Sequence, residues 1–95
     1  VGASGVISVL SNVAPQETHA ICQKWFDGDL KGAREAQFKA YPLIKALFAE
    51  VNPIPVKAAL NLMGKNVGPL RLPMTEATDS TKALLKDEMT KYGIL

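Results

Sequence analysis

The stretch that decides the fold is Glu50-Val51-Asn52-Pro53-Ile54-Pro55-Val56-Lys57, near the middle of the 95-residue chain. Proline fixes φ, lacks an amide N–H and pushes the preceding residue out of the α region, so a helix cannot continue through these two prolines. A second helix can begin here, with Asn52 as its cap and Pro53 or Pro55 in its first turn. The stretch therefore predicts two helices joined at a rigid corner, an architecture that by itself indicates no activity.

Helical periodicity continues toward the N-terminus from this corner. A first helix is predicted to begin at Pro15 and to end at Gly28. Its apolar face predicts that Trp25 packs inside the protein. A second helix is predicted from an Asp29 cap to Val51, with a kink but no break at Pro42, because the apolar pattern resumes in phase beyond it.

On the other side of the corner, a third helix is predicted to end at Gly64. Residues 65–74 contain two prolines and one glycine, which predicts an irregular connector held to the body by Leu70, Leu72 and Met74. The last helix is predicted to begin at a Thr78 cap. Its packed side consists of Leu84, Leu85, Met89 and Tyr92.

Residues 6–10, Val-Ile-Ser-Val-Leu, are the only stretch that predicts a strand. The segment is short, rich in β-branched residues and nearly all apolar, which is typical of a parallel strand covered on both faces. Such a strand needs neighbours, and the rest of the sequence contains no second convincing strand. We therefore expect the chain to be a fragment whose missing strands precede it.

Composition excludes several classes of function. The net charge of +2 comes from scattered residues, with no basic run, so a nucleic-acid partner is not expected. The single cysteine, Cys22, cannot form an internal disulfide and is predicted to be a core residue in a reducing compartment. With His19 it offers two metal ligands where structural zinc takes four, so no metal is expected. No apolar run can span a bilayer, and a cytoplasmic location without cofactors is predicted.

The polar residues offer few catalytic combinations. The serines at positions 4, 8 and 11 have no histidine and carboxylate nearby in sequence that would indicate a triad, and helix capping explains Asp27 and Asp29. His19 is predicted to be solvated or hydrogen-bonded locally. A buried lysine can act as a nucleophile, but Lys57 is predicted to make an ion pair or a carbonyl contact on an outer helix.

Three motifs carry a resemblance to a known family. They are Asn52-Pro53-Ile54-Pro55-Val56-Lys57-Ala58-Ala59, then Leu70-Arg71-Leu72-Pro73-Met74-Thr75, and finally Tyr92-Gly93-Ile94-Leu95. In this order they resemble the carboxy-terminal third of the dihydrodipicolinate synthase family, whose members are pyruvate-dependent class I aldolase-type lyases on a (β/α)8 TIM barrel. A complete barrel takes about 250 residues, which agrees with a fragment.

The resemblance implies a mostly α chain in two parts: residues 1–28 are the final strand and helix of the barrel, and residues 29–95 are a three-helix extension. It further implies that the lysine that forms a Schiff base with pyruvate lies upstream of Val1. In this chain Ile7 matches the family's pyruvate-contacting isoleucine, whose main-chain carbonyl faces the Schiff base. Aspartate semialdehyde is the implied second substrate, and a homotetramer is the implied assembly.

A second hypothesis remains open at this stage. The chain can instead be a free-standing helical module for protein interaction, with residues 1–10 as a disordered or partner-pairing arm. That hypothesis predicts a cooperatively folded protein without catalysis.

Overall fold

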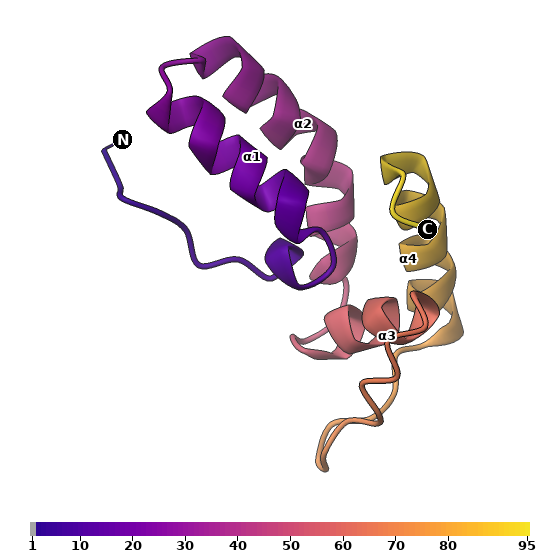
Figure 1. The fold of residues 1–95 in the computed structure, drawn as a ribbon. Helices are drawn as coiled ribbons and strands as arrows, with labels where there is room; N and C mark the ends of the chain where they lie inside the picture. The colour runs from indigo at the N-terminus through magenta and orange to yellow at the C-terminus, as the bar shows by residue number, and fades with distance from the viewer. Residues whose placement is uncertain (1) are drawn as a thin grey trace.

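The structure, a computed structural model, describes residues 2–95. Within that range the chain forms a short 3-10 helix, η1 (Leu10–Asn12), and four α-helices, α1 (Pro15–Phe26), α2 (Leu30–Leu47), α3 (Ile54–Leu62) and α4 (Asp79–Tyr92). Helices α1 and α2 lie side by side, α3 contacts α2 and η1, and α4 packs on α2 and α3 (Figure 1). The prediction of a mostly α chain is confirmed.

The predicted strand over residues 6–10 is wrong for this chain. Residues 2–9 form an irregular arm, Val9 has helical backbone angles, and Leu10 begins η1. A strand needs a neighbour to pair with its backbone groups, and residues 2–95 provide none. Ile7 is therefore fully exposed at 108% and Val6 is 64% exposed, although both side chains are apolar and β-branched.

The predicted helix ends are mostly confirmed. Pro15 occupies the first turn of α1, and the Asp29 carboxylate caps α2 by accepting the Gly32 amide at 2.9 Å. Pro42 lies inside α2 without breaking it. Gly93 ends α4 in the left-handed conformation, with φ of 94°.

The corner differs in detail from its prediction. Helix α2 ends at Leu47, four residues before the predicted Val51, and turns fill the interval. Pro53, rather than Asn52, occupies the N-cap position of α3, and no side chain caps that helix. Pro55 lies in the first turn as predicted, where its missing N–H leaves no hydrogen bond unmade.

The core lies where α2, α3 and α4 meet. Leu43 and Leu47 from α2 contact Leu85 and Met89 from α4, and all four are less than 2% exposed. Ala59 of α3, at 0% exposure, lets the helices approach closely. The same cluster includes Leu10, Val13 and Ala14, so η1 is anchored to the core.

Three predicted packing residues lie at the surface instead. Leu72 is 87% exposed, Trp25 43% and Leu84 41%, and Cys22 is only partly buried. Helical period places a residue on a face, but a neighbouring element must cover that face before the residue is buried. No element among residues 2–95 covers these side chains.

The chain is more open than a self-contained domain of its size. Its radius of gyration is 14.2 Å, where about 12 Å is typical for this length. Its accessible surface is 6352 Å², where about 5,300 Å² is typical for this mass. No helix within residues 2–95 has both the length and the apolar character needed to cross a bilayer.

Candidate functional site

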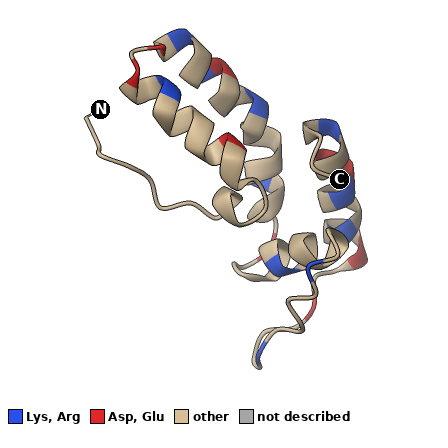
Figure 2. Ribbon diagram, viewed as in Figure 1, with Lys and Arg blue, Asp and Glu red and all other residues tan. Residues whose placement is uncertain are grey.

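The arm that contains Ile7 precedes the helices and projects along α1 (Figure 1). Residues 2–7 are exposed, and no hydrogen bond to the rest of residues 2–95 involves the Ile7 main chain. Its carbonyl oxygen is thus available to a contact outside the described residues. The arm is also uncharged, since the first charged residue of the chain is Glu17 (Figure 2). The role of Ile7 stays a prediction.

Immediately after Ile7, side chains hold the backbone in a tight turn. The Ser8 hydroxyl accepts the Ser11 amide at 3.1 Å, and the Ser11 hydroxyl donates to the Ser8 carbonyl at 2.8 Å. The Asn12 side-chain amide donates to the Val9 carbonyl at 3.0 Å. These serines therefore stabilise local structure, and no triad involves them.

The other residues singled out in the sequence lie away from the arm or act in structure. The Lys57 ammonium donates to the Pro69 carbonyl at 2.6 Å, which confirms the predicted carbonyl contact. Asp27 accepts the Gln23 side-chain amide at 2.8 Å. His19 is exposed on α1, as expected for a solvated side chain. No group of three or more metal-ligating side chains occurs within residues 2–95.

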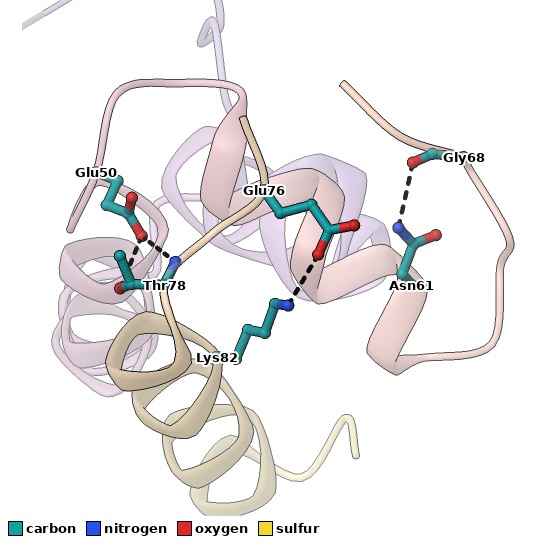
Figure 3. Close-up of polar contacts among 6 residues, drawn as sticks. All are labelled: Glu50, Asn61, Gly68, Glu76, Thr78 and Lys82. Atoms are coloured by element: carbon teal, nitrogen blue, oxygen red, sulfur yellow. Dashed lines mark hydrogen bonds and ion pairs between the residues drawn. The ribbon is translucent and has the colours of Figure 1, made fainter. Parts of the chain in front are cut away.

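Glu50 is the polar residue that sequence reasoning missed. Its carboxylate accepts the Thr78 amide at 3.0 Å and the Thr78 hydroxyl at 3.2 Å, so it reaches the N-terminus of α4 (Figure 3). The hydroxyl of Thr81 and the amide of Thr78 lower the pKa of Glu50 below its ordinary value of 4.5. The partners are 28 residues apart, and no short motif signals such a contact.

Two cavities within residues 2–95 have volumes near 500 Å³. One, of about 500 Å³, lies between α3, the segment that joins α3 to α4, and α4 itself. There Asn61 holds the 65–74 connector, and Lys82 pairs with Glu76 at 3.1 Å (Figure 3). The other, of about 480 Å³, is mostly apolar and lies between the arm, α1 and α2 beside Cys22 and Trp25. Neither contains a nucleophile paired with a base, so neither is a catalytic centre by itself.

Known proteins match this chain along nearly its whole length. The model of the dihydrodipicolinate synthetase family matches residues 1–92. The 4-hydroxy-tetrahydrodipicolinate synthase of Lachnoclostridium phytofermentans is 56% identical over 94 residues, which are 99% of this chain and 32% of that protein.

Solved structures agree with the sequence matches. The crystal structure of dihydrodipicolinate synthase from Thermotoga maritima matches with a TM-score of 0.97 and 51% identity, covering 99% of this chain and 32% of that one. The chloride-inhibited enzyme of Acinetobacter baumannii, solved in complex with pyruvate, matches with a TM-score of 0.93 and 36% identity over 99% of this chain and 32% of that one.

The chain thus spans about a third of the length of the relatives it matches. It corresponds to the carboxy-terminal part of these TIM-barrel enzymes, as the resemblance implied. A family model that covers residues 1–92 and a fold that superposes almost completely lead to the same conclusion. The chain belongs to the dihydrodipicolinate synthetase family.

Proposed function

We propose that this chain acts as the carboxy-terminal part of a lyase that condenses pyruvate with aspartate semialdehyde to give 4-hydroxy-tetrahydrodipicolinate, a step of lysine biosynthesis. The observation that carries the proposal is the family match over residues 1–92, with 56% identity to a named synthase. The pyruvate complex of the relative from Acinetobacter baumannii supports the first substrate.

In the proposed reaction, a lysine amine from the preceding part of the enzyme attacks the keto carbon of pyruvate, and water leaves to give an iminium. Loss of a methyl proton gives an enamine, which attacks the aldehyde carbon of aspartate semialdehyde. The amine of that substrate then attacks the iminium carbon and closes the ring, and the lysine is released. Within this chain the Ile7 carbonyl oxygen lines the pyruvate site, where its partial negative charge favours the cationic iminium.

The helices after residue 28 have a structural role in this proposal. The extended shape of the chain supports this role. A chain with a radius of gyration of 14.2 Å exposes apolar surface that a larger body can cover. The uncharged arm before Glu17 supports it too, since burial of an uncharged segment carries no charge-desolvation cost. The boundary between residues 1–28 and 29–95 belongs to the same proposal.

A homotetramer in the cytoplasm completes the proposal. The single Cys22, with no internal partner, agrees with a reducing compartment. One solved dihydrodipicolinate synthase variant, with 51% identity to this chain, is described as monomeric. Sedimentation velocity of the complete enzyme tests this point, and a monomer at micromolar concentration contradicts the tetramer.

A chimera tests the activity. The part of the Thermotoga maritima enzyme that this chain matches is replaced by residues 2–95, and condensation of pyruvate with aspartate semialdehyde is measured. We expect activity within about tenfold of the parent, because the two segments share 51% identity and superpose with a TM-score of 0.97. A folded chimera that forms no condensation product overturns the proposal.

The Ile7 assignment has its own test in that chimera. If the main-chain carbonyl is the contact, Ile7→Val retains activity within about threefold, because the substitution leaves the carbonyl in place and keeps β-branching. The matched control is Val6→Ile, the reverse exchange at the preceding residue, whose own side chain is 64% exposed. A loss of activity with Ile7→Val beyond that range indicates a side-chain contact instead.

A further inference from the structure

We propose that Ser8 and Ser11 are positioning residues for the Ile7 carbonyl. The reciprocal pair of hydrogen bonds between them, here called the serine clamp, begins at the residue that directly follows Ile7. This inference rests on the proposed function, because it concerns the orientation of a carbonyl assigned to the pyruvate site.

The serine clamp holds two atoms of Ser8, the side-chain oxygen and the carbonyl oxygen. Its side-chain oxygen accepts the Ser11 amide at 3.1 Å, and its carbonyl oxygen accepts the Ser11 hydroxyl at 2.8 Å. With Cβ and the carbonyl carbon held, tetrahedral geometry at Cα also fixes the direction of the Ser8 nitrogen. Only one torsion, φ of Ser8, then separates the clamp from the Ile7 carbonyl, and sterics restrict that torsion mostly to negative values.

The clamp is also attached to the rigid part of the molecule. Asn12 donates to the Val9 carbonyl at 3.0 Å, and the Ala14 amide donates to the Leu10 carbonyl at 2.9 Å. Leu10 is 5% exposed and belongs to the core formed with α2 and α4. Residues 2–7, by contrast, make no such contacts within the described chain. Within residues 2–95, the hydrogen bonds that reach the arm therefore come from its C-terminal side, through Ser8.

The proposed consequence is catalytic. A carbonyl that is already oriented stabilises a developing cation without reorganising, whereas a freely rotating one loses part of that effect. Loss of the clamp should therefore slow formation of the pyruvate iminium while leaving the binding of aspartate semialdehyde unchanged.

The test uses the chimera with the Thermotoga maritima enzyme. Ser11→Ala removes the hydroxyl that donates to Ser8, and Ser11→Thr retains a hydroxyl at that position. We expect Ser11→Ala to lower kcat, and the rate of borohydride trapping with pyruvate, by about threefold to tenfold, and KM for aspartate semialdehyde to stay within about twofold. Ser11→Thr should restore most of both rates.

Thr90 provides the matched control. Its hydroxyl makes a similar local bond, to the Lys86 carbonyl at 2.7 Å, but on the exposed side of α4 far along the chain from the arm. Thr90→Ala should change neither kcat nor the rate of borohydride trapping, even if it lowers the melting temperature as much as Ser11→Ala does.

The outcomes separate the two proposals. An inactive but folded chimera overturns the proposed function. An active chimera in which Ser11→Ala matches Thr90→Ala in kcat and trapping rate overturns the serine clamp alone. Equal losses in Ser11→Ala and Ser11→Thr also overturn it, because the hydroxyl is then not the cause.

Discussion

At the scale of single residues, Glu50 connects the corner after α2 to the start of α4. Thr78 already caps α4 with its own hydroxyl, which accepts the Thr81 amide at 3.3 Å. The Glu50 carboxylate accepts the amide of that capping residue, at the helix end where negative charge is favoured. This side chain therefore adds a polar link between the corner and α4 to the apolar packing of Leu85 and Met89.

This contact predicts a pH-dependent stability. Because folding lowers the pKa of Glu50 below 4.5, its contribution is present above that value and is lost as pH falls through the folded-state pKa. Glu50→Gln should therefore lower the free energy of urea unfolding at neutral pH, and the difference from the unsubstituted chain should shrink in acid.

Glu35→Gln is the control for that experiment. Glu35 is exposed and lies 3.9 Å from Lys31, a distance at which an ion pair adds little. Its substitution should leave the unfolding free energy nearly unchanged at both pH values. A Glu50→Gln difference that does not vary with pH contradicts the role assigned to the carboxylate.

At the scale of elements, α4 has two neighbouring leucines in opposite environments. Leu85 is 0% exposed in the core, whereas Leu84 is 41% exposed. Leu85→Ala should cost about 2–5 kcal/mol of unfolding free energy, and Leu84→Ala less than about 1 kcal/mol. Urea unfolding measures both. Equal costs would indicate that α4 packs with a different face.

The connector after α3 gives a second prediction at this scale. The Val67 amide donates to the Asn61 side chain at 2.9 Å, and Asn61 in turn donates to the Gly68 carbonyl at 3.3 Å (Figure 3). Asn61→Ala removes the acceptor, so hydrogen exchange at the Val67 amide should accelerate at least about tenfold.

The Gly64 amide is an internal control for the exchange measurement. It donates to the main-chain carbonyl of Asn61 at 2.9 Å, and the alanine variant keeps that carbonyl. Its exchange rate should stay the same. Acceleration at both amides would mean that the end of α3 has unfolded, rather than that the connector has been released.

At the scale of the whole molecule, the proposed function assigns one edge of the pyruvate site to this chain and the Schiff-base lysine to the preceding part of the enzyme. The most prominent lysine, Lys57, donates to Pro69 in the 65–74 connector, away from the arm. Residues 2–95 incubated alone with pyruvate and borohydride should therefore gain no mass from a reduced adduct. Mass spectrometry makes the measurement, and an adduct on Lys57 would contradict the assignment of its role.

Much of this architecture follows from local chemistry in the sequence. Pro15, Asp29, Thr78 and Gly93 set helix ends through backbone conformation and capping, which depend on a few adjacent residues. The motif from Asn52 to Ala59 carried the family resemblance, and the comparisons confirmed it. Local signals failed at Asn52 itself, because which residue caps α3 depends on how the chain turns after Leu47.

The sequence by itself determined the helices, the corner and the family, because proline geometry, capping and motif order act over short distances. Only the tertiary structure decided that residues 6–10 form no strand in this chain, that Trp25 and Leu84 remain exposed, and that Glu50 reaches Thr78. Strand pairing, burial and long-range hydrogen bonds each require a partner brought from elsewhere in the chain, and local residue patterns do not specify that partner.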